Sequence, residues 1–270
     1  MKHLQHYLLL SMAMIAYPGV NAHAQNTHSF KLGFEGGYYD YRESGLMENV
    51  GGLYGGFGEY KLHIGEMSSF LPDTFMLESN IKGGSADYSS NGTGSLDGVG
   101  HFLGEGRVLM GKQFQASNSI KLIPFLGFGY RYLNTENTGK LTTTGHRGYE
   151  RESNYLYIPI GLKMNTEFNQ DWGLDVAAEY DVFVDGEQKS HFNAVRSDYP
   201  DAVNQQSKGY GVRASIDLTK KTDSVGFLVG TYIRWWDIGK SNVEQNGIFR
   251  GGYEPKNQTL EAGIRAGITF

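Results

Sequence analysis

The chain has 270 residues, no cysteine, a formal net charge of −5 and a mean hydropathy of −0.42. The mild acidity, without a basic block, excludes nucleic acid as an expected partner, and the lack of cysteine excludes disulfides and thiolate chemistry. The 38 glycines disfavour a helical protein, since glycine costs about 1 kcal/mol in a helix interior. The low mean hydropathy argues only against membrane helices.

The first 24 residues have the features of a secretory signal peptide. Lys2 supplies a positive start, Leu4–Ala16 is mostly apolar, and the sequence Ala-His-Ala at 22–24 is a cleavage pattern. The apolar run is too short for a transmembrane helix. We therefore expect residues 1–24 to be removed on export and residues 25–270 to form one domain.

Apolar and polar residues then alternate with a period of two. Successive side chains of a strand point to opposite faces, so each alternating segment predicts a strand with one apolar and one polar face. In chain order the segments are Phe30–Tyr39, Val50–Leu62, Phe75–Lys82, His101–Met110, Ile120–Leu133, Tyr155–Met164, Trp172–Val184, Tyr210–Leu218, Val225–Trp236 and Asn257–Phe270. Val50–Leu62 and Ile120–Leu133 carry apolar residues on both faces, so their orientation stays open.

The strand lengths and connections favour a membrane barrel. These segments of 8–14 residues exceed the mean strand of soluble proteins, and most are long enough for a tilted bilayer crossing. The shorter connections are Gly65–Asp73, Gln115–Ser119, Glu167–Asp171 and Lys220–Ser224, and the longer ones are Asp87–Gly98, Asn134–Gly148, Asp185–Gln206 and Lys240–Lys256. The predicted fold class is an all-β, transmembrane, antiparallel up-and-down β-barrel of ten strands, with eight or twelve as alternatives. A lipocalin-like or sandwich fold is the soluble alternative.

The C-terminal segment Gly263–Phe270 resembles the closing signature of Gram-negative outer-membrane proteins, an alternating strand with a terminal aromatic residue. Phe125–Tyr132 and Tyr155–Leu162 resemble central strands of the small outer-membrane β-barrel domain family, which is porin-like. The resemblance implies location in the outer membrane, contact with its lipid and lipopolysaccharide, and recognition of Phe270 by the barrel-assembly machinery. It is weak for activity, because the family includes channels, adhesins and proteins of unknown role.

The polar faces carry charges of both signs, which a barrel would place in its lumen. A ten-stranded barrel is only slightly wider than one that side chains fill, so we expect a paired network that plugs it, a charged solute path being the alternative. The candidate network is Glu35, Glu105, Arg107, Asp175, Glu179, Arg213, Asp217, Arg234, Glu261 and Arg265. Tyr38, Tyr132, Trp172, Tyr180, Tyr210 and Trp235 on the apolar face are candidates for interfacial girdles.

The strand count also resembles the omptin proteases, which activate water between an Asp pair and an Asp–His pair. Asp87 and Asp97 form no Asp-x-Asp motif, and His191 belongs to no Asp-x-His motif. The adjacent pairs Ser190-His191 and His28-Ser29 have no orienting acid placed by sequence, and Asp198 and Asp201 read as solvated loop charges. His101 reads as a hydrogen-bonded lumen residue, and no His/Cys cluster has metal-ligand spacing. We therefore expect no catalytic, cofactor-binding or metal residues.

Three functions stay open at this point. The first is a structural or surface-interaction barrel without catalysis, whose long extracellular loops contact a ligand. The second is a narrow porin-like channel for small solutes. The third is a surface hydrolase of the omptin or lipid-acylhydrolase type.

Overall fold

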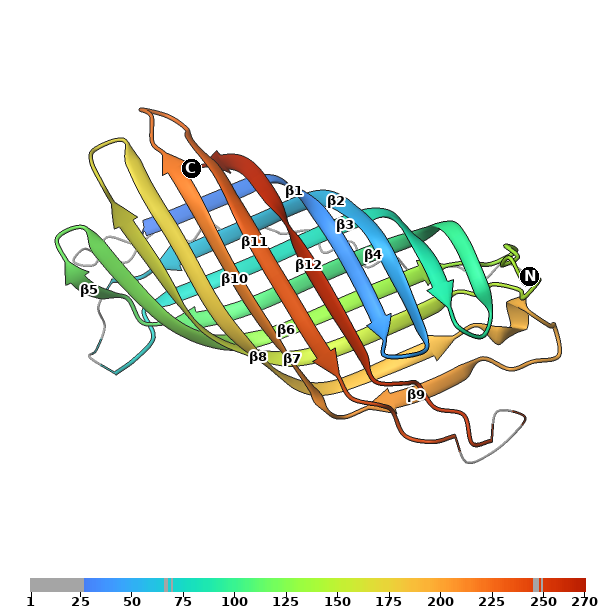
Figure 1. Ribbon diagram of the computed structural model, residues 1–270. Helices are drawn as coiled ribbons and strands as arrows, with labels where there is room; N and C mark the ends of the chain where they lie inside the picture. The colour runs from blue at the N-terminus through green and yellow to red at the C-terminus, as the bar shows by residue number, and fades with distance from the viewer. Residues whose placement is uncertain (1–26, 66–67, 69, 245–247, 249) are drawn as a thin grey trace, which may run out of the picture.

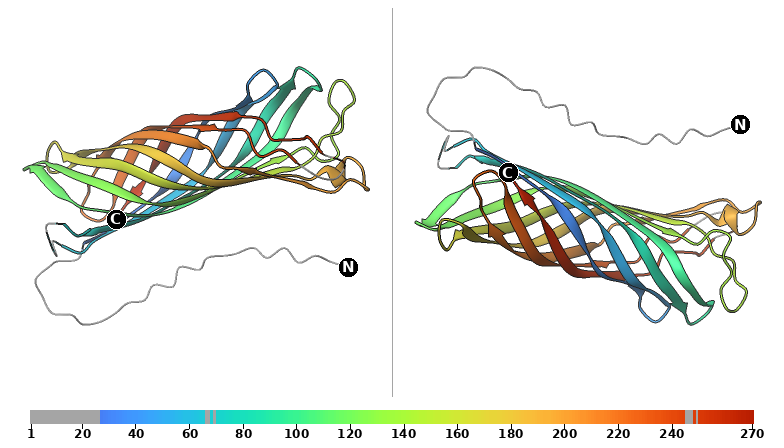
Figure 2. Two further views of the ribbon diagram at one scale, coloured as in Figure 1. Left: turned by 90° about the horizontal axis from the view of Figure 1, so that it is seen from below. Right: turned by 90° about the horizontal axis from the view of Figure 1, so that it is seen from above.

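The computed structural model describes residues 27–270 except 66–67, 69, 245–247 and 249, so the expected signal peptide lies outside the described residues. Ten long antiparallel strands form a closed barrel (Figures 1 and 2). They are β1 (Thr27–Glu43), β2 (Met47–His63), β3 (Thr74–Ser90), β4 (Gly94–Gly111), β6 (Ile120–Glu136), β7 (Arg151–Glu167), β8 (Trp172–Ser190), β10 (Gly209–Lys220), β11 (Gly226–Ile238) and β12 (Asn257–Thr269). The predicted ten-stranded, all-β barrel is confirmed.

Each long strand pairs with its neighbours in the chain, and β12 pairs with β1 to close the sheet. Two short strands, β5 (Phe114–Ser117) and β9 (Ala202–Gln206), extend the wall by pairing with β6 and β8. A single 3₁₀ turn, Phe192–Ala194, lies among the loops of the described chain. No helix in the described part of the chain is both long and apolar enough to cross a membrane.

The barrel has two different ends. Connections 64–73, 112–119, 168–171 and 221–225 lie at one, here called the turn end, where Phe270 also pairs with Phe30 through two backbone hydrogen bonds. Connections 44–46, 91–93, 137–150, 191–208 and 239–256 lie at the other, the loop end. In barrels of outer membranes the longer loops are extracellular.

The loop end differs from the sequence-based expectation in one connection. Asp87–Gly98 is not a long loop: β3 and β4 continue through it to a turn at 91–93, with a bulge between Ala86 and Tyr88. The side chain of Asp87 fills that bulge by accepting a hydrogen bond from the Gly98 amide at 2.9 Å. Asp185–Gln206 is likewise partly strand, since β8 runs to Ser190 and β9 returns alongside it.

Several strands are also longer than expected, with 17 residues in β1, β2, β3, β6 and β7. At about 3.3 Å per residue and a tilt near 45°, such a strand rises about 40 Å, against an apolar band of roughly 25 Å. The strands are therefore longer than an apolar band of that height requires. The residues in these extensions are mostly polar, so the alternation of apolar residues does not predict them.

The apolar faces point outward. Phe34, Ile160 and Ile264 are 80%, 52% and 70% exposed and lie on different parts of the wall. Exposed large apolar side chains recur on every long strand, whereas soluble monomers rarely expose contiguous apolar patches larger than a few hundred Å². Among the girdle candidates, Tyr210 stacks on Tyr180 at 5.7 Å and contacts Trp235 at 5.4 Å on this outer surface.

The structure orients the two ambiguous strands. In β2, Leu53 and Phe57 are buried inside while Tyr54 is 66% exposed outside. In β6, Ile123 and Phe125 are buried inside while Leu126 and Phe128 face outward. Apolar residues occupy the inner face here because they pack with other buried apolar side chains, Leu53 with Tyr39 and Leu103, and Ile123 and Phe125 with Met76 and Leu109.

Gly129 of β6 provides a cradle for a lumen aromatic residue. A Cβ atom added there would lie 2.1 Å from Cζ of Tyr157, a fully buried ring. We expect Gly129→Ala to lower the free energy of unfolding by about 1–3 kcal/mol, because the ring must move within a packed lumen. Urea titration of the folded barrel measures this. Gly106→Ala, whose added Cβ meets nothing within 4 Å, is the matched control and should cost much less.

Candidate functional site: a charged lumen beneath a cup

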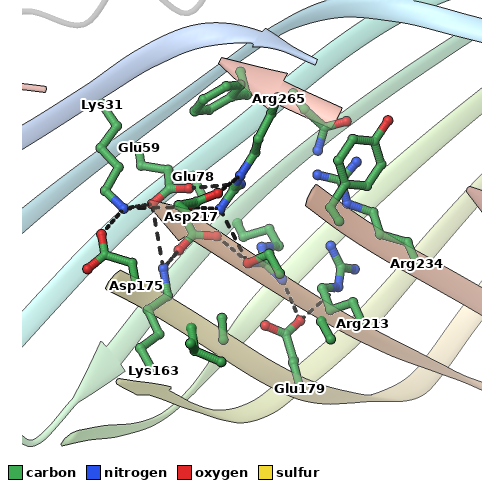
Figure 3. A pocket seen from close by; sticks show the side chains of 18 of the residues that line it. Lys31, Glu59, Glu78, Lys163, Asp175, Glu179, Arg213, Asp217, Arg234 and Arg265 are labelled. Atoms are coloured by element: carbon green, nitrogen blue, oxygen red, sulfur yellow. Dashed lines mark hydrogen bonds and ion pairs between the residues drawn. The ribbon is translucent and has the colours of Figure 1, made fainter. Parts of the chain in front are cut away.

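The lumen near the turn end is filled by an ion-pair cluster (Figure 3). Lys31 of β1 lies 2.7 Å from Asp175 of β8 and 3.8 Å from Glu59 of β2. Lys163 reaches Glu59 at 3.7 Å from β7. These contacts cross the barrel interior, joining strands far apart in the chain.

Two arginines occupy the next part of the lumen. Arg213 of β10 donates to Glu105 at 2.9 and 3.0 Å and to Asp181 at 2.9 Å, and it lies 3.0 Å from Glu179. Arg107 of β4 bridges Glu78 and Glu179. The buried Tyr157 hydroxyl also donates to Glu105 at 2.6 Å. Each guanidinium therefore neutralises more than one carboxylate.

A third group lies between these arginines and the loop end. Arg234 binds both oxygens of Glu35, at 2.6 and 3.0 Å. Lys82 contacts Glu35 at 3.3 Å and also donates to Glu261, which accepts a second hydrogen bond from Arg131 at 2.9 Å. The buried aromatic residues Tyr39, Tyr155, Tyr157 and Trp236 belong to one apolar cluster, here the aromatic layer, which packs against these groups, with the Trp236 ring 5.4 Å from the Arg131 guanidinium.

All ten residues of the predicted network lie on the inner wall, and each makes at least one ion pair. Asp217, for example, holds Arg265 through a hydrogen bond of 2.6 Å from Nε. Two further lumen charges, Glu59 and Arg131, belong to the two strands whose orientation the alternation left open. Their charge was the available signal, since a charged side chain in a membrane-spanning strand belongs in the lumen.

The lumen and the loop end differ greatly in free space. The larger cavity among the lumen ion pairs has a volume of about 80 Å³, room for a few waters. At the loop end a cup of about 820 Å³ opens above the aromatic layer. Its lining includes Tyr88, Tyr149, Arg151, Phe192, Tyr199 and Glu254.

The base of the cup is a charged triad. Arg151 donates to Glu43 at 2.8 Å and also to Glu254, while Tyr41 donates to both carboxylates. Burial raises the pKa of Glu254 to about 7, Arg151 opposes this, and the neighbouring Glu43 adds to it.

The structure separates most of the catalytic candidates. Asp87 and Asp97 both lie within the β3–β4 bulge and are exposed, and Asp185 is exposed on β8. His28 bonds to the Tyr60 hydroxyl at 2.8 Å. His101 faces the lumen, packs on Tyr39 at 5.1 Å and bonds to Thr135 at 3.3 Å.

His191 is the exception among them. Its Nδ1 lies 3.0 Å from Oδ2 of Asp201, so Asp201 is not simply a solvated loop charge. The two residues are ten apart, at either end of the segment that joins β8 to β9. Sequence motifs missed this pair because the return of β9 along β8 creates it. Ser190, by contrast, points inward and is buried.

The sequence matches no protein-family model and no curated protein. Among solved structures, it is similar to the outer membrane protease OmpT from Escherichia coli, with a TM-score of 0.54 and 11% identity over 91% of this chain and 95% of that one. A major outer membrane protein from Thermus thermophilus has a TM-score of 0.40 and 10% identity, covering 90% and 99%. Ail from Yersinia pestis has a TM-score of 0.30 and 9% identity, covering 92% and 100%.

At 11% identity the likeness to OmpT concerns the fold and not the activity. It agrees with the closed sheet, the outward apolar belt and the charged interior described above. The chain therefore has the fold of an outer-membrane β-barrel.

Proposed function

We propose that the protein is a closed outer-membrane barrel with a structural and surface-interaction role, which binds an extracellular ligand through its loop end and performs no catalysis. The contrast between the lumen and the cup carries this proposal. Two cavities of about 80 and 50 Å³ lie among the paired charges of the lumen, while the cup offers about 820 Å³. Ligand sites are typically concave, with apolar walls and a few placed polar groups.

The cup supports this role through its chemistry. Tyr149 and Phe192 pack together with their ring centroids 4.5 Å apart, and Tyr88 and Tyr199 also line the wall. Arg151 and Glu254 provide charge of both signs at the base. Rigid aromatic groups combined with a few charges suit a partly apolar ligand that carries its own charge.

The remaining parts of the proposal concern the route to the membrane. Export through residues 1–24, recognition of Phe270 by the barrel-assembly machinery, and contact of the outer belt with lipid and lipopolysaccharide follow from the sequence. The position of Phe270 supports the second, since it extends β12 and stays 55% exposed at the turn end. Each is independent of what the cup binds.

The channel alternative predicts the opposite behaviour in a planar bilayer. We expect the wild-type protein to give no stepwise current, because paired side chains occupy the lumen. A charge-neutral variant with Glu105, Arg107, Glu179 and Arg213 all changed to alanine should conduct. The exposed pair Glu167 and Lys221, changed to alanine together, is the control and should stay silent.

Steady current through the wild-type barrel would overturn the closed-lumen proposal in favour of a channel. If the quadruple variant is folded and still gives no current, the other lumen side chains are sufficient to close the barrel. The hydrolase alternative is tested with peptide and phospholipid substrates. If the wild-type protein hydrolyses either substrate and His191→Ala or Asp185→Ala abolishes the activity, the non-catalytic proposal is wrong.

A further inference from the structure

A group of polar side chains lies at the loop end, outside the residues that line the cup. Glu150 and Glu152 flank the first residue of β7, and His191 follows the last residue of β8. The backbone brings them together, because the His191 amide donates to the Glu150 carbonyl at 3.0 Å and continues the β7–β8 ladder. One ligand atom from each of the three lies within 4.8 Å of the other two.

The hydrogen bonding of His191 fixes what its second nitrogen can do. Asp201 is acceptor-only when ionised, so the contact of 3.0 Å places the ring proton on Nδ1 in the neutral imidazole. Nε2 then presents a lone pair. This nitrogen is buried and makes no hydrogen bond among the described residues, and it lies 3.6 Å from Oε1 of Glu152.

A lone pair that faces carboxylates at this distance is an arrangement that a cation bound between them would satisfy. Imidazole nitrogen with carboxylate oxygens is a ligand set of divalent zinc, and a carboxylate on the far nitrogen is the usual outer partner of a metal-bound histidine. Glu150 has an outer partner as well, since Asn134 of β6 donates to its Oε1 at 2.6 Å. Lys189 lies 3.4 Å from the same Oδ2 atom of Asp201 that contacts His191.

We propose that Glu150, Glu152 and His191 bind a divalent transition-metal ion of the zinc class. His191 binds through Nε2, each glutamate through one oxygen, and water completes a tetrahedral shell. Asp201 and Asn134 are positioning residues that orient His191 and Glu150. The ion would tie the start of β7 to the segment that follows β8, on the opposite side of the wall from the cup.

The test is zinc titration of tag-free, folded protein in detergent, by calorimetry and by competition with a chromophoric chelator. We expect one zinc per barrel in the wild type and none in His191→Gln or in the double variant Glu150→Gln/Glu152→Gln. Asp201→Asn should weaken binding by about 10–100-fold while keeping one site. Cobalt should give visible absorption bands that disappear in His191→Gln.

The matched control is His146→Gln, another loop-end histidine, whose Nδ1 bonds to the Thr144 hydroxyl at 2.9 Å. It should bind zinc as the wild type does. Heat-dependent gel mobility confirms that each variant is folded. Zinc binding that survives in folded His191→Gln, or no zinc binding by the wild type, would overturn the proposal and leave a protonated imidazole held between Glu152 and Asp201.

Discussion

Replacing Glu261 by glutamine is expected to lower the free energy of unfolding by about 3–5 kcal/mol, the cost of leaving buried charges without their partner. The Glu261 carboxylate is 3% exposed and neutralises Lys82 and Arg131, whose side chains are 0% and 1% exposed. Lys82 retains Glu35 in the variant, but Arg131 has no other ion pair among the described residues. Glutamine keeps the shape of the side chain, so the loss reports charge and not packing.

Urea unfolding in lipid vesicles, followed by tryptophan fluorescence, measures this effect, because Trp236 lies 5.4 Å from the Arg131 guanidinium. The matched control is Glu167→Gln. That residue makes the same type of ion pair with Lys221, but both side chains are more than half exposed, and such pairs contribute about 0–1 kcal/mol. Equal losses in the two variants would show that the lumen network does not stabilise the barrel.

Ile160→Arg should destabilise the membrane-inserted barrel by about 2–4 kcal/mol, the cost of arginine on the lipid face near the bilayer midplane. Ile160 stands in the middle of β7, pairs with Leu126 and Tyr180 on the flanking strands, and is 52% exposed. In a soluble barrel the same change would replace a solvent-exposed apolar side chain with a charged one and would be nearly neutral.

The same vesicle experiment compares Ile160→Arg with Thr138→Arg, a change in the loop after β6 that should have little effect. The difference between the two variants should shrink when the barrel is kept in a short-chain detergent, where water reaches the wall more easily. An Ile160→Arg barrel as stable as the wild type in vesicles would contradict the placement of this outer face in hydrocarbon.

Alternation in the sequence was sufficient to predict the class of fold, the number of strands and, for most strands, which residues face inward and which face outward. The physical reason is that a membrane-spanning strand has one side in lipid and the other in a polar lumen, so the polarity of each residue indicates which side it faces. Glu35, Arg213 and Arg234 could be placed inside on that basis alone. Alternation did not orient Val50–Leu62 and Ile120–Leu133, where Leu53 and Phe125 pack inside the barrel in clusters of buried apolar residues.

Partners within the lumen could not be read from the chain. Arg234 and Glu35 are 199 residues apart in the sequence, and Arg213 and Glu105 are 108 apart. They meet because the closure of the sheet and the stagger of its strands determine which side chains lie at the same height in the barrel. The same holds at the loop end, where His191 meets Asp201 and the two glutamates only after β9 folds back and β7 pairs with β8. The sequence by itself thus determined which side of the wall each residue faces, a local property of alternating strands. Only the tertiary structure decided which charges meet, since that depends on register and closure around the whole barrel.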